Sequence, residues 1–204
     1  MNDADIRQSF HRKRLRRHHA RQNTLVIDEL GLNHGRCRAD IAVINGHFVG
    51  YEIKSNNDSL RRLEEQVKSY SAVFDRIFVV VGERHINSIH NYIPQWWGII
   101  VSVRGPRGAV NFDTIRRAQA NTSVDPISLA RLLWRNEAEE ILRQEKLPPR
   151  ILRQPRAILY EHLVDKLDIC KLRELIRKYF KKRKNWRSPE LPSRCGGSCQ
   201  PAAT

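Results

Sequence analysis

Three charged residues lie in a stretch that otherwise has the pattern of buried β-strands. Residues 38–54 read as two strands around Asn45-Gly46. Asp40 opens an apolar run on the first strand, while Glu52 and Lys54 are two residues apart on the second and project from one face. A buried charge is costly unless it is paired or binds a metal. Two carboxylates and an ammonium at one edge of a sheet therefore indicate a site for a divalent cation.

The length of the turn decides whether this site can form. With a plain two-residue turn, Asp40 faces Tyr51, and Glu52 points to the opposite side of the sheet. A three-residue loop of Asn45, Gly46 and His47, or a bulge further along, places Asp40 opposite Glu52. We therefore predict such an irregularity, and a regular two-residue hairpin would count against the metal site.

The order Asp40, eleven intervening residues, then Glu52-x-Lys54 resembles the motif of the PD-(D/E)XK nuclease superfamily. That superfamily includes many restriction enzymes, Holliday-junction resolvases and RecB-type nucleases. The resemblance covers residues 20–105 and suggests a short bacterial or phage-type member of the RecB and resolvase branch. Ala39 stands where the motif's name has proline.

The resemblance implies a Mg²⁺-dependent hydrolase, a nuclease that cleaves phosphodiester bonds of nucleic acid, most of all DNA. The implied catalytic residues are Asp40, Glu52, Lys54 and Gln66. The implied ligands of Mg²⁺, with Mn²⁺ as an alternative ion, are Asp40, Glu52, Glu29 and the backbone carbonyl of Ile53. Asp28 is an alternative to Glu29 as the upstream carboxylate ligand.

Two other functional classes remain open at this point. One is a catalytically inactive nucleic-acid-binding module of the same fold, which would bind nucleic acid without regard to Mg²⁺. The other is a structural or toxin-immunity interaction protein with no affinity for nucleic acid. The intact carboxylate pair weighs against the first alternative, and the basic terminal segments weigh against the second.

The elements around the motif predict an α/β fold, a restriction-endonuclease-like mixed central sheet flanked by helices, with a C-terminal helical extension. Apolar periodicity predicts an amphipathic helix over residues 58–74, with Gln66 beside its apolar stripe. The remaining expected elements of the core are strands at 23–30, 76–82, 96–103 and 109–112 and a short helix at 83–93.

Shifts in composition divide the chain into four parts. We expect a basic N-terminal helix in residues 1–22, a nuclease-like core in 23–120, a basic helical extension in 121–187 and a disordered tail in 188–204.

The overall charge favours a polyanionic partner. The chain has 37 Lys and Arg residues against 22 acidic ones, a formal charge of +15, and such a surplus suits nucleic acid. A homodimer is a further option, because the superfamily often dimerises. The candidate nucleic-acid-binding residues are Arg12, Lys13, Arg14, Arg16, Arg17, Lys178, Lys181, Lys182, Arg183 and Lys184.

The expected compartment is the cytoplasm, with no membrane partner. No apolar run approaches the ~20 residues of a membrane span, and the N-terminus lacks the apolar core of a signal peptide. The four cysteines suit reduced thiols. Cys195 and Cys199 have no nearby His or third Cys, so we do not expect a zinc site there.

Overall fold

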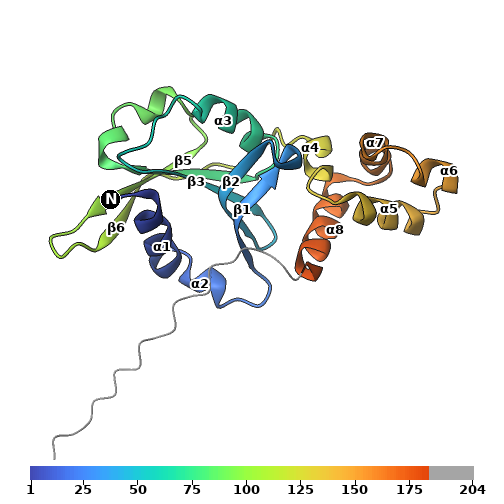
Figure 1. The fold of residues 1–204 in the computed structure, drawn as a ribbon, viewed down its shortest axis with the longest axis horizontal. Helices are drawn as coiled ribbons and strands as arrows, with labels where there is room; N and C mark the ends of the chain where they lie inside the picture. Colours follow the sequence, from blue (N-terminus) through green and yellow to red (C-terminus); the bar gives the residue numbers. More distant parts are fainter. Residues whose placement is uncertain (184–204) are drawn as a thin grey trace, which may run out of the picture.

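A six-stranded mixed sheet organises the chain in the computed structural model, which describes residues 1–183 (Figure 1). The strands follow one another across the sheet in sequence order. The pairs β1/β2, β2/β3 and β5/β6 are antiparallel, whereas β3/β4 and β4/β5 are parallel. The predicted α/β class, a mixed sheet with flanking helices and C-terminal helices, is confirmed. Strand bounds are β1 Leu25–Leu32, β2 Cys37–Ile44, β3 Phe48–Lys54, β4 Arg76–Gly82, β5 Gly98–Arg104 and β6 Val110–Arg116.

The hairpin between β2 and β3 has the three-residue loop that its charges require. Ile44 pairs with Phe48 across Asn45, Gly46 and His47, and the ladder continues to the pair of Ile41 and Tyr51. The next step in the same register sets Asp40 across from Glu52. The predicted irregularity of the turn is therefore confirmed, and both carboxylates lie on one face of the sheet.

Each face of the sheet has its own helical cover. Helices α1 Asp3–Lys13 and α2 Arg16–His19 lie on one side of the sheet, and α3 Leu63–Ser71 lies on the other (Figure 1). Under α1, Ile6 and Phe10 are buried in a cluster with Ile41 and Ile53. Helix α1 begins at a capping box in which the side chain of Asn2 accepts a hydrogen bond from the backbone N–H of Asp5.

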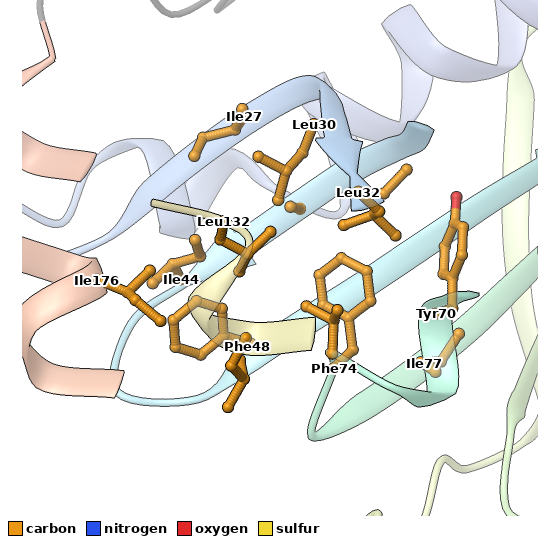
Figure 2. Close-up of a cluster of buried hydrophobic side chains, with 14 of the residues drawn as sticks. Ile27, Leu30, Leu32, Ile44, Phe48, Tyr70, Phe74, Ile77, Leu132 and Ile176 are labelled. Carbon is orange, nitrogen blue, oxygen red and sulfur yellow. The ribbon is translucent and has the colours of Figure 1, made fainter. Parts of the chain in front are cut away.

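The C-terminal helices extend the core beyond the sheet. Figure 2 shows Leu132 and Ile176 meeting Ile44 and Phe48 of the central hairpin. The buried cluster on the α3 side thus runs from the sheet into the helical extension. The helices are α4 Pro126–Ala130, α5 Arg135–Gln144, α6 Pro149–Leu152, α7 Arg156–Lys166 and α8 Ile169–Lys182.

Several elements differ from the sequence-based prediction. The N-terminal helix breaks after Lys13, where the chain turns and buries Leu15 at 1% exposure. Helix α3 starts later than expected, and the helix expected over 83–93 is two short 3₁₀ turns, η2 Glu83–His85 and η3 Ile89–Asn91. Asn87 and Ser88 between these turns favour local turns over a continuous helix. A third such turn, η1 Asn33–Gly35, links β1 and β2.

Within residues 1–183, none of the helices has the length and apolar character needed to cross a membrane. The predictions about Lys184, about Cys195 and Cys199, and about a disordered tail at 188–204 lie outside the described residues.

Candidate functional site

The carboxylate of Glu52 is the centre of a buried hydrogen-bonded cluster. Its Oε1 atom lies 2.5 Å from Nζ of Lys54 and 2.6 Å from Nε2 of Gln66. Its Oε2 atom accepts a hydrogen bond from the hydroxyl of Tyr70. Glu52 itself is only 1% exposed. Both oxygens of a buried carboxylate are therefore satisfied by side chains from β3 and α3.

Asp40 is held in the same way by β3 and α1. Its Oδ2 atom accepts a hydrogen bond from the backbone N–H of Ile53 at 2.7 Å. The guanidinium of Arg7 lies 3.2 Å from Oδ1 of Asp40 and donates to the backbone carbonyl of Asp40 at 2.7 Å. The same guanidinium is 3.1 Å from Oε1 of Glu29. Arg7 thus joins two carboxylates on neighbouring strands.

All of these groups except Tyr70 line a cavity of about 950 Å³ between the start of α1 and helix α3. Burial raises the pKa of Glu52 to about 7, and the nearby charge of Asp40 adds to this rise. Burial also raises the pKa of Asp40, opposed by the N–H of Ile53 and the charge of Arg7. Burial raises the pKa of Tyr70 well above its usual value, which keeps its hydroxyl protonated and able to donate.

The residues predicted as catalytic lie together in the structure. Asp40, Glu52, Lys54 and Gln66 all line the cavity. Ile53 reaches Asp40 through its backbone N–H. Glu29 lines the cavity too, at the one position of β1 with a left-handed φ, 56°.

Asp28, the rival upstream carboxylate, lies elsewhere. Its side chain is 3.0 Å from Nε2 of His11, a residue of α1. The structure therefore brings Glu29, and not Asp28, to the cavity.

The sequence-based prediction of the site did not include two members of the cluster, Arg7 and Tyr70. Arg7 contacts Asp40 across 33 residues of chain, and no local pattern signals such a contact. Tyr70 follows the apolar periodicity of the helix predicted over residues 58–74, and this periodicity indicates only a role in the core. Tyr70 stands four residues after Gln66, so both side chains lie on one helical face, and this spacing was an available signal.

Binding of Mg²⁺ or Mn²⁺ stays a prediction, and the arrangement of donors does not favour it. All four carboxylate oxygens of Asp40 and Glu52 already have partners within the protein. Residues 1–183 contain no group of three or more His, Cys, Asp or Glu side chains arranged to share an ion. A cation would have to displace Arg7 or Lys54 from these oxygens, and the protein cations already supply the compensating charge.

The basic N-terminal segment forms a second feature, which we call the N-terminal basic pocket. Its volume is about 530 Å³, and its floor includes Phe10, Tyr51 and Phe78. Its basic lining consists of Lys13, Arg14, Arg16, Arg17 and His18, and no acidic side chain lines it. Four of the five N-terminal residues predicted to bind nucleic acid therefore surround one pocket, while Arg12 is exposed nearby on α1.

The residues of α8 predicted to bind nucleic acid have different surroundings. Lys178, Lys181 and Lys182 are exposed. Lys181 donates to the side chain of Asn23, which brings the basic end of α8 beside the segment that follows α2. Arg183 is turned inward, because its guanidinium pairs with the buried carboxylate of Glu137.

Fold and site together define a mixed α/β protein with a closed carboxylate and cation cluster and a separate basic pocket. The profile of the family described as "Bacteriophage P4 protein cII" matches residues 6–196, so the chain belongs to that family. "Protein cII" of Enterobacteria phage P4 is 25% identical over 173 residues, which are 85% of this chain and 64% of that relative. The chain thus spans less than two thirds of the relative's length. No solved structure matches it.

This family membership overturns the predicted identity and activity. The chain is not a member of the PD-(D/E)XK nuclease superfamily, and the predictions of a nuclease, a hydrolase and an enzyme are wrong. The motif misled because Asp, Glu and Lys on adjacent strands also suit a purely internal network of charges. In this protein Lys54 contacts Glu52, and Arg7 contacts Asp40.

Proposed function

We propose that this protein binds nucleic acid, with DNA as the first candidate, through the N-terminal basic pocket and the neighbouring end of α8. The observation that carries the proposal is the basic lining of that pocket. Lys13 and Arg14 are held by the neutral side chains of Asn111 and Thr114, so their charges stay available to a phosphate backbone. Each phosphate neutralised by such a residue releases counterions, which favours binding at low salt.

The position of α8 supports a larger binding surface. Its exposed residues Lys178, Lys181 and Lys182 add three cations close to the chain that leaves α2. A surface of this kind contacts the sugar–phosphate backbone, which gives affinity without sequence specificity. We place the activity in the cytoplasm, a proposal supported by the free thiols of Cys37 and Cys170.

The test is fluorescence anisotropy with a labelled DNA duplex over a series of salt concentrations. Wild type is compared with the double variant Arg16→Glu/Arg17→Glu. The matched control is Arg104→Glu/Arg107→Glu, which reverses the charge of two exposed arginines at the turn between β5 and β6. We expect the affinity of wild type to fall as salt rises. The Arg16/Arg17 variant should bind at least about tenfold more weakly, with a salt slope shallower by about two.

The control variant should keep most of the affinity. Absence of binding by wild type at low salt, or equal losses in both double variants, would contradict the proposal. The same assay with an RNA duplex of matching sequence compares the two nucleic acids.

A further inference from the structure

A third cavity, which we call the C-terminal aromatic pocket, lies where η1 meets the helical extension. Its volume is about 440 Å³, within the usual range for small-ligand sites. Four arginines and a histidine contribute to its wall, and no carboxylate does. Its polar and aromatic lining residues are His34, Arg131, Trp134, Arg135, Arg156, Tyr160 and Arg183.

Trp134 presents a large aromatic surface at this pocket. It is 58% exposed and stands immediately before α5. The guanidinium of Arg183 stacks over the indole ring at 4.3 Å and is fixed by its ion pair with Glu137. One side of the ring is therefore supported by a rigid planar cation while more than half of the residue remains open to solvent. An indole held in this way is a ready platform for another flat ring.

His34 provides a second ring. It stacks on Tyr160 with the centroids 5.6 Å apart and the planes 26° apart. Asn33, His34 and Gly35 all have left-handed φ values, of 46°, 59° and 83°. Three consecutive left-handed residues are unfavourable when two of them are Asn and His. A contact with the helical extension stabilises this conformation, because the guanidinium of Arg131 donates to the side chain of Asn33. The loop is thus anchored with the histidine ring at the pocket.

The charges of the pocket are unbalanced. Arg135 pairs with Glu139, and Arg183 pairs with Glu137. In contrast, no acidic side chain within residues 1–183 forms an ion pair with Arg131 or Arg156. The pKa of His34 is lowered by partial burial and then by the charges of Arg156 and Arg131. This shift is a second sign that cations converge here, and it favours an anionic group in the pocket.

We propose that the C-terminal aromatic pocket binds an unpaired nucleotide of a single nucleic-acid strand, with the base against Trp134 and a phosphate held by Arg131 and Arg156. This inference rests on the proposed nucleic-acid binding and adds a preference to it. Flat aromatic rings beside guanidinium groups match the two parts of a nucleotide, the base and the phosphate. The bases of a duplex are stacked inside the helix, so only an unpaired base can reach the pocket.

The test compares a labelled oligothymidylate strand with a labelled DNA duplex by fluorescence anisotropy. The variants are Trp134→Ala, Trp134→Phe and Arg156→Ala, and the control is Arg153→Ala, an exposed arginine outside the pocket lining. We expect Trp134→Ala to weaken binding of the strand about tenfold, the effect of losing one base–aromatic stack. Trp134→Phe should recover most of that loss. Arg156→Ala should weaken strand binding more than Arg153→Ala, and duplex binding should change little in any variant.

The outcomes separate this inference from the proposed function. If wild type binds the duplex, but neither Trp134→Ala nor Arg156→Ala weakens strand binding more than the control, the pocket is not a nucleotide site and the proposed function stands. If Trp134→Ala weakens strand and duplex equally, the preference for an unpaired base is wrong. If wild type binds neither probe, both proposals fail. Thermal unfolding of each variant identifies any loss of affinity that comes from misfolding.

Discussion

The hydroxyl of Tyr70 donates a hydrogen bond to Glu52 and accepts one from the backbone N–H of Asp40. A single side chain of α3 thereby ties together the two strands that carry the central carboxylates. Tyr70 is fully buried, so water cannot replace either bond.

We expect Tyr70→Phe to destabilise the protein by about 1–3 kcal/mol, because it leaves a buried carboxylate oxygen and a buried amide without this partner. The loss should appear in the free energy of unfolding by urea. Tyr92→Phe removes the hydroxyl of a half-buried tyrosine outside the cluster and is the matched control. Equal stability of Tyr70→Phe and wild type would show that the hydroxyl contributes nothing to the cluster.

Glu52 should make stability depend on pH. Its pKa is raised by burial from an ordinary 4.5 to about 7. Between these pH values the folded protein retains a proton that the unfolded chain has lost, so the free energy of unfolding falls as pH rises through this window. Glu52→Gln removes the titrating group, and its stability should vary less between these limits.

Urea unfolding at a series of pH values measures this effect. Glu65→Gln is the control, because Glu65 lines the same cavity but is exposed. It should keep the wild-type dependence on pH. An unchanged slope in Glu52→Gln would mean that the pKa of Glu52 is not raised in the folded protein.

The ion pair of Glu137 and Arg183 should stabilise the helical extension. Their side chains are 7% and 8% exposed, and Glu137 also accepts from the backbone N–H of Trp134 at 2.8 Å. Glu137→Ala removes the carboxylate from a buried guanidinium, for which we expect a cost of about 3–5 kcal/mol in chemical unfolding. Glu139→Ala, which removes a more exposed partner of Arg135 and Arg143, should cost at most about 1 kcal/mol. Similar costs for the two variants would contradict this assignment.

Gly98 should not tolerate a side chain. A Cβ atom at this position would lie 2.3 Å from the ring of Phe78 and 2.8 Å from the backbone nitrogen of Ala118. Because the backbone cannot move aside without disturbing β5, we expect Gly98→Ala to cost about 1–3 kcal/mol of unfolding free energy. The control is Gly31→Ala, where the nearest atom is 3.7 Å away. A Gly98→Ala variant as stable as Gly31→Ala would contradict the close packing of this strand.

Local features of the fold were predictable, and the distant contacts were not. The charges of Asp40 and Glu52 predicted an irregularity in the hairpin, a three-residue loop or a bulge, because a strand alternates faces and a two-residue turn places them on opposite sides. The structure has the three-residue loop. The pairing of Arg183 with Glu137 joins residues 46 apart, and no periodic pattern along the chain specifies such a partner. Arg183 therefore looked like a surface cation of a basic helix.

The functional prediction failed for a related reason. Asp40, Glu52 and Lys54 are residue types that suit metal-assisted chemistry, but they also neutralise one another when buried. The sequence shows their spacing but not that Arg7, 33 residues before Asp40, donates to Oδ1 and the backbone carbonyl of Asp40. Residue type and spacing alone suit both an ion site and an internal charge network, so they do not identify a nuclease.

The docking of the N-terminal helices should weaken in acid. Nδ1 of His11 and Nε2 of His19 are 2.9 Å apart, so one ring must be neutral there to accept the hydrogen bond. The pKa of His19 is lowered by partial burial, then by His11 and by His18, against the opposing charge of Asp28. The folded protein therefore binds this proton less tightly than the unfolded chain, and stability should be lost as pH falls through about 6.5.

His19→Gln keeps a neutral acceptor beside His11 and removes the second titrating ring. We expect the protection factors of amides in α1 and α2, which are exchange rates corrected for the intrinsic effect of pH, to fall in wild type below about pH 6.5, and to fall less in the variant. His90→Gln, which changes an exposed histidine on η3, should behave as wild type. The N-terminal basic pocket depends on this docking, because Lys13, Arg14, Arg16 and Arg17 lie on the same segment. Identical acid sensitivity of wild type and His19→Gln would show that this pair of histidines does not control the docking of the segment.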